Sequence, residues 1–373
     1  MPQIYLDNNA STPIAPAVAA AMRDVLEDAY GNPSSLHWAG APARDIVESA
    51  RQQVADLLGC GASEIVFTSG GSEANNHALT GTFFASTKPR RHIITTAVEH
   101  PAIVEPCRFL EGQGAEITVL PVDGTGRMDP NDLRRAITSD TILISIMHAN
   151  NEVGTIQPIA ECSAIAREHG VLFHADAAQS VGKIATKVDL LGVDLLTIAG
   201  HKIYAPKGVG VLYIRAGVTL EPLIHGASHE SGRRAGTESA LLTTALGSAC
   251  AVAADLAPME TVQALRDQFW TALQDRFGNR IALNGHPQHR LPNTLNVSFV
   301  GQDGGALLGH LEGIAASTGS ACHEDSVELS PVLEAMGVAP EVGMGAIRFS
   351  LGRDTTAAEI HAVVAAVSNA LGT

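Results

Sequence analysis

Residues 194–214 read DLLTIAGHKIYAPKGVGVLYI. A β-rich run ends at Ile198, a turn of small residues follows, and His201 and Lys202 lead into a loop of Pro and Gly. A lysine at the end of a strand and among small residues suits imine formation, because its amine can be held partly desolvated within reach of a carbonyl. An ordinary lysine on a surface loop would also fit this stretch, so the role of Lys202 has to be inferred together with the other segments of the chain.

Seven β-rich runs are expected to form strands, at residues 64–68, 92–96, 115–120, 141–147, 171–175, 194–198 and 209–214. Most of them are separated by stretches with helical periodicity, as parallel strands with helical crossovers require. Only ten residues separate the last two runs, which is short enough for an antiparallel pair. The sequence therefore predicts an α/β fold with a mostly parallel seven-stranded sheet and helices on both faces.

The pattern changes after residue 235. Long Ala- and Leu-rich helical runs cover residues 239–256 and 259–277, and short strands near 293–300 and 346–352 alternate with further helices. Such an alternation is typical of a separate, smaller α+β domain. We expect a large domain over residues 16–258, a small C-terminal domain over 259–373, and an N-terminal segment, 1–15, that joins the small domain.

Composition excludes several classes of protein. The chain has 373 residues, is 45% hydrophobic and carries a net charge of -15, and its 24 Lys and Arg residues are scattered, so no nucleic-acid partner is expected. No apolar stretch is long enough to span a membrane and no signal peptide is recognisable, which predicts a cytoplasmic protein without a membrane partner. Five widely spaced cysteines without a CxxC pair predict neither a disulfide framework nor a metal site.

Polar residues follow the expected strands where a ligand of an open α/β sheet would bind. Asp176, in HADAAQSVGK, comes directly after one strand and could pair with a pyridinium nitrogen, although a helix N-cap is the ordinary alternative. The string FTSGGSEANNHAL places Gly70, Gly71 and Ser72 at a strand-to-helix turn. Backbone N–H groups and the helix dipole could bind phosphate there, although a double-glycine turn is also a common connector.

Two further strand ends carry candidate residues. His100 follows the strand that ends at Thr96, and Asn150 and Asn151 follow the strand that ends at Met147. Because the carboxyl ends of neighbouring parallel strands meet at one edge of a sheet, these groups are expected to share a rim with the phosphate-binding turn. Such a convergence of ordinary residues favours an active site.

Together these segments resemble the cysteine desulfurases, the NifS- and IscS-like enzymes among the class V, fold-type I enzymes that depend on pyridoxal 5'-phosphate (PLP). The resemblance runs nearly end to end and includes YLDNNASTP, GNPSSLH, TSGGSEANN, EHPA, HANNEVGTIQPI, HADAAQSVGK, GHKIYAPKGVG, GRRAGTES, STGSACHEDSVELSPVLEAMG and IRFSLGR. It implies a soluble transferase that converts L-cysteine to L-alanine and passes the sulfur to an acceptor protein, such as an iron–sulfur cluster scaffold or a thiolation enzyme.

The resemblance also implies roles for residues around the cofactor. Lys202 would hold PLP as an imine and move the proton between the substrate carbon and the cofactor. Asp176 would pair with the pyridine nitrogen, and His100 would stack on the ring and accept a proton from the substrate thiol. Gln179 and Asn151 would lie near the ring hydroxyl and the substrate.

Phosphate and substrate binding involve a second set of residues in the family. Gly71, Ser72 and His201 would bind the phosphate of PLP. Thr237 would reach the phosphate in the neighbouring subunit, which implies a homodimer with shared active sites. Arg348 would bind the substrate carboxylate, a role that suits a bidentate guanidinium.

Cys322 is the nucleophile that the resemblance implies. It lies in ASTGSACHEDS, a polar segment of small residues between an expected strand and an expected helix, and so on a loop. Its thiolate would attack the sulfur of the bound substrate and carry the persulfide to the acceptor. For Cys107, Cys162 and Cys250 we expect the ordinary role of a buried, inert cysteine.

Two positions depart from the family pattern. Ala199 stands where many members have a serine hydroxyl on the phosphate, so one hydrogen bond of about 0.5–3 kcal/mol is absent or supplied by another group. After the nucleophile, His323, Glu324 and Asp325 replace small hydroxyl residues. The carboxylates would raise the pKa of the Cys322 thiol and a protonated His323 would lower it, so the net direction stays open.

Three other functions are compatible with the sequence. A selenocysteine lyase is the nearest alternative, and another class V aminotransferase or lyase without a cysteine nucleophile is a broader one. A non-catalytic scaffold with a PLP fold is the third, but it would not need an imine that exchanges with substrate. Loss of Cys322 distinguishes the desulfurase from the other enzymes.

Overall fold

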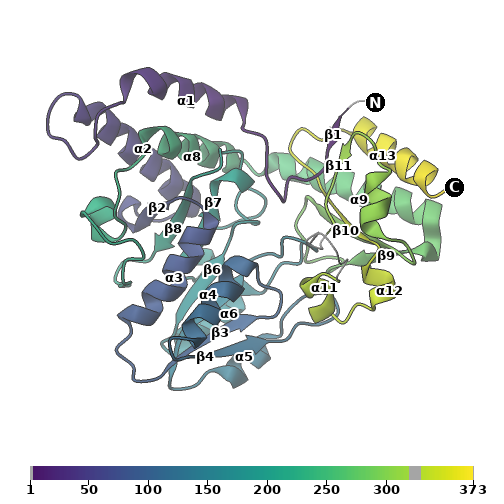
Figure 1. Cartoon of the computed structure of the whole chain (residues 1–373), viewed down its shortest axis with the longest axis horizontal. Helices are drawn as coiled ribbons and strands as arrows, with labels where there is room; N and C mark the ends of the chain where they lie inside the picture. Colours follow the sequence, from purple (N-terminus) through teal and green to yellow (C-terminus); the bar gives the residue numbers. More distant parts are fainter. Residues whose placement is uncertain (1–2, 319–328, 373) are drawn as a thin grey trace.

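The computed structural model of the chain describes residues 3–318 and 329–372. Figure 1 shows a larger lobe and a smaller lobe, joined by the N-terminal segment and by the chain between α8 and α9. The larger lobe is built on a seven-stranded sheet in the order β2-β8-β7-β6-β5-β3-β4. Its strands are β2 (Ile65–Thr68), β3 (Arg91–Thr96), β4 (Ala115–Leu120), β5 (Thr141–Met147), β6 (Leu172–Asp176), β7 (Leu195–Ala199) and β8 (Gly210–Ile214).

The sheet confirms the fold predicted from the sequence. The neighbouring pairs among β7, β6, β5, β3 and β4 are parallel, whereas β8 runs antiparallel to both β7 and β2. The connection from β7 to β8 has no room for a helical crossover, and it contains only a turn of 3-10 helix over Gly200–Lys202. Lys202 therefore lies just after the end of β7, in the short connection to the antiparallel strand β8.

Helices cover both faces of this sheet, so its strands are buried on each side. All seven residues of β5 are buried, and alternate residues along it face different cores: Ile144 packs with one set of helices and Leu143 with another. One face packs against α3 (Gly71–Ala85) and α4 (Pro101–Glu111). The other packs mainly against α2 (Gly40–Leu58), α6 (Ile159–Glu168) and α8 (Ala240–Ala253).

Three further helices complete the larger lobe: α1 (Pro16–Asp28), α5 (Pro130–Ala136) and α7 (Val188–Leu191). The smaller lobe has a three-stranded antiparallel sheet in the order β12-β10-β9. Its strands are β9 (Ile281–Asn284), β10 (Thr294–Phe299) and β12 (Ala346–Ser350). Its helices are α9 (Ala257–Phe277), α10 (Gly304–Gly309), α11 (Pro331–Ala335), α12 (Pro340–Gly343) and α13 (Ala357–Ala370).

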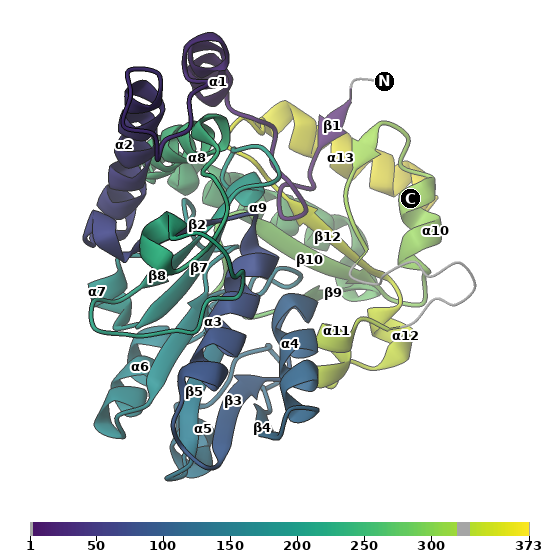
Figure 2. The ribbon, with the colours of Figure 1, turned by 60° about the vertical axis from the view of Figure 1, so that its left-hand side comes forward.

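The N-terminal segment begins in the smaller lobe. Strand β1 (Ile4–Tyr5) pairs in parallel with β11 (Ile314–Ala315), and Ile4 and Leu6 are buried in the core formed by α9, α13 and the three-stranded sheet. Figure 2 shows the segment passing from β1 across to α1. The domain boundaries near residues 15 and 258 stay predictions, since the contacts of the segment do not define where a domain ends.

Over the described ranges, no single helix is both long and apolar enough to cross a membrane. Helices α8 and α9 meet the length and composition requirement only when taken together, and they are bent by 70° relative to each other.

Candidate active site

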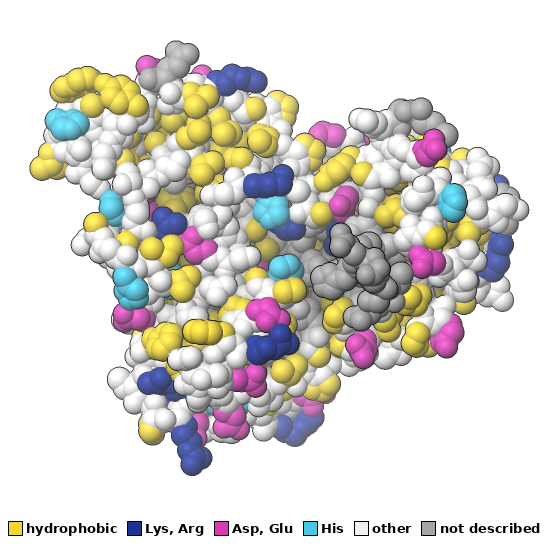
Figure 3. Space-filling model, viewed as in Figure 1, with side chains coloured by type: hydrophobic (Ala, Val, Ile, Leu, Met, Phe, Trp, Pro, Cys, Tyr) yellow, Lys and Arg dark blue, Asp and Glu magenta, His cyan; other side chains and the backbone are white. Residues whose placement is uncertain are grey.

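A cavity of about 410 Å³ lies at the carboxyl ends of the central strands. The last residues of β5, β6 and β7, which are Met147, Asp176 and Ala199, all line it. Figure 3 shows the face of the molecule that is hollowed between the two lobes, with histidine and basic side chains near the hollow. The remaining lining residues are Asn9, Ala10, Gly71, Ser72, Asn75, His100, Ala102, Ala149, Asn151, Ala178, Gln179, His201, Lys202 and Arg348.

Lys202 enters this cavity from the turn after β7. Gly200 allows that turn because a Cβ there would lie 2.8 Å from the carbonyl oxygen of Val209. The Lys202 amine donates to the carbonyl oxygens of Asn9 at 2.6 Å and Ala10 at 2.8 Å. Burial lowers the pKa of Lys202 to about 8, and the charge of Arg348 acts in the same direction. The amine is therefore held in place and partly deprotonated near neutral pH.

Attack of the Lys202 amine on an aldehyde is expected to have a midpoint near pH 8. At pH 7.5 about a quarter of the amines would be neutral, against about one in a thousand for an ordinary lysine with a pKa near 10.5. Rapid mixing of apoprotein with PLP between pH 6.5 and 10.5 measures the rate of imine absorbance. A rate that keeps rising to a midpoint at or above pH 10 would contradict the expectation.

Asp176 presents a fixed carboxyl group on the rim. Its side chain is buried, and its Oδ2 accepts from Asn75 Nδ2 at 2.7 Å while Oδ1 accepts from the Ala178 backbone N–H at 2.9 Å. Two neutral donors thus hold the carboxyl group in one orientation. A pyridinium N–H in the cavity is a suitable further donor for this group.

His100 directly precedes α4, and its ring caps the start of that helix. Nδ1 accepts from the Ala102 backbone N–H at 3.0 Å, so the neutral ring carries its proton on Nε2. Removal from bulk water lowers the pKa of His100, and the carboxylate of Asp176 opposes this shift. In this state Nε2 is a donor, and accepting a proton from a thiol would require the ring to change tautomer and give up the cap.

Glu99, the residue before His100, connects the ends of the neighbouring strands β3 and β5 through hydrogen bonds. Its carboxyl accepts from the Thr96 hydroxyl at 2.7 Å and from the Met147 backbone N–H at 2.9 Å. Burial raises the pKa of Glu99 to about 8, and the charge of Asp176 adds to the effect. This buried group positions the start of α4 and therefore His100.

The turn before α3 has the features of an anion site. Helix α3 begins after Gly70 without a side-chain cap, so its first N–H groups are free to bind an anion where Gly71 and Ser72 line the cavity. His201 also lines the cavity, and its Nδ1 is buried with no partner among the described residues. Burial lowers the pKa of His201 to about 4, which leaves a neutral ring that can donate to a phosphate.

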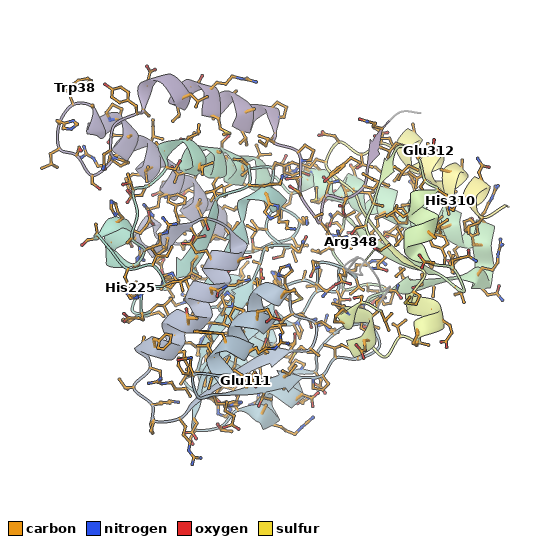
Figure 4. The ribbon with its side chains drawn as sticks, viewed as in Figure 1. Trp38, Glu111, His225, His310, Glu312 and Arg348 are labelled. Carbon is orange, nitrogen blue, oxygen red and sulfur yellow. The ribbon has the colours of Figure 1, made fainter. Side chains whose placement is uncertain are left out.

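Arg348 reaches the cavity from the smaller lobe, and Figure 4 shows it between the two lobes. Its Nη2 donates to Asp7 Oδ1 at 2.7 Å and its Nη1 to the Asn151 carbonyl oxygen at 3.0 Å. Its Nε is buried without a partner among the described residues. The guanidinium is thus held on one side and has a donor left for a carboxylate.

The structure brings nine of the predicted site residues to one cavity. Thr237 lines a separate pocket of about 150 Å³ between the end of β2 and the start of α8. Cys322 lies outside the described residues. Cys107, Cys162 and Cys250 are buried as expected, and burial raises the pKa of each thiol to about 12.

Sequence reasoning missed several residues that complete the site. Asn9, Ala10 and Asp7 come from the N-terminal segment, whose LDNNA string was used only for the resemblance. Asn75 lies inside the helix that follows the phosphate-binding turn, where its sequence position does not distinguish it from other polar helix residues. A polar string that precedes the first helix, DNN, is the signal that could have drawn attention to Asp7 and Asn9.

The polar groups in this cavity fit PLP group by group. A desolvated amine can hold the aldehyde, a fixed carboxylate can pair with the ring nitrogen, and an uncapped helix start with an unpartnered imidazole can hold the phosphate. Ala199 lines the cavity without a hydroxyl, so His201 and the α3 N–H groups would hold the phosphate. When bound, PLP supplies a ring that accepts the electron pair released at a substrate carbon.

Comparisons with known proteins agree with a PLP-binding cavity. The chain matches the family described as Aminotransferase class-V over residues 4–363. It is 49% identical over 363 residues to "Cysteine desulfurase IscS" of Dictyoglomus turgidum, covering 96% of this chain and 92% of that protein. It is 45% identical to "Cysteine desulfurase IscS" of Methanosarcina thermophila, covering 98% and 91% of the two chains.

Solved structures agree with the sequence relatives. A "NIFS-LIKE PROTEIN" superposes with a TM-score of 0.93 at 36% identity and covers 99% of both chains. The structure described as "SspA in complex with cysteine" superposes with a TM-score of 0.85 at 35% identity, covering 95% of this chain and 100% of that one. With a family match across almost all of its length and relatives of this similarity, the chain belongs to the class V aminotransferase family and, within it, to the PLP-dependent cysteine desulfurases.

Proposed function

We propose that this chain removes the sulfur of L-cysteine, releases L-alanine, and carries the sulfur as a persulfide on Cys322 to an acceptor protein. The observation that carries the proposal is one cavity in which the Lys202 amine, the Asp176 carboxyl and the Arg348 guanidinium converge. An amine, an acid that pairs with a ring nitrogen, and a carboxylate-binding cation are what an amino-acid substrate and PLP require together.

Each side chain has a separate task in this proposal. Arg348 binds the substrate carboxylate and so orients the α-carbon toward Lys202. The Lys202 amine, once free, takes the proton from that carbon and returns it, for which a pKa near 8 is well suited. The Asp176 carboxyl group would pair with the ring nitrogen. His100 offers its Nε2–H as a donor from α4.

Sulfur transfer then uses the thiol of Cys322. In the overall step the carbon–sulfur bond of L-cysteine breaks, a sulfur–sulfur bond forms on Cys322, and the substrate β-carbon gains a hydrogen to give L-alanine. No external oxidant or reductant is needed, because the sulfur is oxidised as the carbon is reduced. Transfer of the outer sulfur to an iron–sulfur scaffold or a thiolation enzyme regenerates the thiol.

A homodimer with shared sites is part of the proposal. Thr237 lies away from the cavity of its own chain, and its loop is fixed by the ion pair from Arg234 Nε to Glu73 Oε1 at 2.9 Å. Between α1 and α2, the apolar side chains of Tyr30, Leu36 and Trp38 are 74%, 96% and 80% exposed. Large exposed apolar groups of this kind are typical of an interface, and Figure 4 labels Trp38 at the outer end of the larger lobe.

The direct test is turnover of L-cysteine by the purified protein reconstituted with PLP. Alanine, sulfide and protein-bound persulfide are measured with and without a reductant or a candidate acceptor protein. Equal amounts of alanine and transferred sulfur are expected. Alanine-free elimination products, or transamination that consumes a keto acid, would instead favour another class V reaction.

Replacing Arg348 by Lys is expected to raise the KM for L-cysteine by about 10- to 100-fold, because a charged hydrogen bond contributes about 1.5–3 kcal/mol and lysine lacks the planar fork. The absorbance of bound PLP should be unchanged. Arg353→Lys is the matched control, since Arg353 lies in the same motif but contacts the Asp255 carbonyl oxygen outside the cavity. A KM equal to that of the wild type in R348K would remove Arg348 from substrate binding.

A further inference from the structure

Lys183 ends the HADAAQSVGK motif, and the proposed chemistry does not use it. Its amine is buried and donates to Gln179 Oε1 at 2.9 Å and to Asn9 Oδ1 at 3.2 Å. Both partners are neutral amide oxygens, and burial holds the pKa of Lys183 well below its usual range, with the charge of Lys202 adding to the effect. A buried amine of this kind is costly, so its hydrogen bonds need an explanation.

The two amides that Lys183 contacts both lead to Lys202. Gln179 Nε2 donates to the Asn9 carbonyl oxygen at 2.9 Å, and the Lys202 amine donates to the same oxygen at 2.6 Å. Because Lys183 occupies Gln179 Oε1, the amide nitrogen of Gln179 faces that shared carbonyl. A flipped amide would place two oxygens against each other.

Lys183 also fixes the N-terminal segment over the cavity. The side chain of Asn9 accepts from Lys183 and Asn293 through Oδ1, and it donates through Nδ2 to the Asn151 carbonyl at 3.1 Å and to Thr294 Oγ1 at 2.9 Å. Asn9 therefore joins the loop after β6 to the loop after β5 and to the smaller lobe. Removing the Lys183 donor would loosen Asn9 and Gln179 at the same time.

We propose that Lys183 is a positioning residue of the PLP site, which orients the Gln179 and Asn9 amides so that the Asn9 carbonyl holds the Lys202 amine where it meets the cofactor aldehyde. The proposal rests on the proposed function, since it concerns the residue that would bind PLP. Lys183 does not line the 410 Å³ cavity, so it acts through Gln179 and Asn9 and does not touch the substrate.

Lys183→Met is the principal test, because methionine has a similar length and no donor. Apoprotein is titrated with PLP, and the dissociation constant and the pH midpoint of the bound-cofactor absorbance are measured. We expect the dissociation constant to rise about tenfold, as loss of one or two buried hydrogen bonds implies, and the midpoint to shift. Asn293→Leu is the comparison variant, because it removes the other donor to Asn9 Oδ1 at 2.9 Å but none to Gln179; it should raise the dissociation constant less than K183M does.

A double variant separates positioning from general stability. The K183M/Q179M variant has no amide oxygen at position 179 that could lose its donor, so it should fold even if K183M does not. In the Q179M background, Lys183→Met should change the PLP dissociation constant and the pH midpoint only a little further. Equal PLP affinity and midpoint in wild type and K183M, or an effect of K183M that is undiminished in the Q179M background, would overturn the proposal. Failure of the wild-type protein to bind PLP through Lys202 would instead overturn the proposed function.

Discussion

A Lys202→Ala protein is expected to bind PLP without a covalent link and to convert L-cysteine on the order of 10³-fold more slowly or worse, because the group that would both hold the cofactor and move the proton is lost. The measurement is reduction with borohydride followed by mass spectrometry of the digested protein. In the wild type the reduced cofactor should be found on the peptide that contains Lys202. In the variant no peptide should carry it.

The matched control for this experiment is Lys207→Ala. Lys207 lies in the same loop, is exposed and does not line the cavity, so its replacement should leave both the covalent link and turnover unchanged. Retention of a reducible link and full turnover in K202A would show that another amine holds the cofactor. Lys183, whose amine also donates to Asn9, would then be the candidate for that amine.

Much of this architecture could be predicted from local sequence. The seven strands were recognisable because strands buried on both faces are nearly continuous apolar runs, as β5 is. The reversed direction of β8 followed from the short connection after β7. Once the strand directions were known, the meeting of Asp176, Lys202 and the loop after β5 at one rim followed from topology alone.

The contacts that complete the site could not be predicted in the same way. Lys202 is held by Asn9 and Ala10, more than 190 residues earlier in the chain, and Arg348 is held by Asp7. These pairs depend on how the N-terminal segment crosses between the lobes, which hydrophobic periodicity does not report. The tautomer of His100 could not be predicted from the sequence either, because it depends on a helix cap that forms only when α4 begins at Pro101.

The helix cap at His100 affects which group can take the proton of the substrate thiol. With Nδ1 engaged by the Ala102 N–H, His100 can donate from Nε2 but cannot accept there. The resemblance implied a proton acceptor at this position, so either the ring changes tautomer during the reaction or another base takes the thiol proton. A neutral Lys202 amine, with its pKa lowered to about 8, is chemically able to do so.

A Cys322→Ser protein is expected to keep its bound PLP and its affinity for L-cysteine, and to lose desulfuration by on the order of 10²- to 10³-fold or more, because a hydroxyl cannot accept the sulfur as a persulfide. Cofactor absorbance should still shift when L-cysteine is added, since the groups that bind PLP and substrate are unchanged. Turnover is followed by alanine release, and the persulfide by the mass of one additional sulfur atom on the Cys322 peptide.

The comparison with Cys60→Ser decides whether this loss is specific. Cys60 is half-buried and burial raises the pKa of its thiol to about 12, so little thiolate is present near neutral pH and its replacement should not change turnover. Normal alanine and sulfide release by C322S would rule out a cysteine persulfide at this position. Loss of activity on L-cysteine with retained activity on L-selenocysteine would instead identify a selenocysteine lyase, because release of selenium need not pass through a protein thiol.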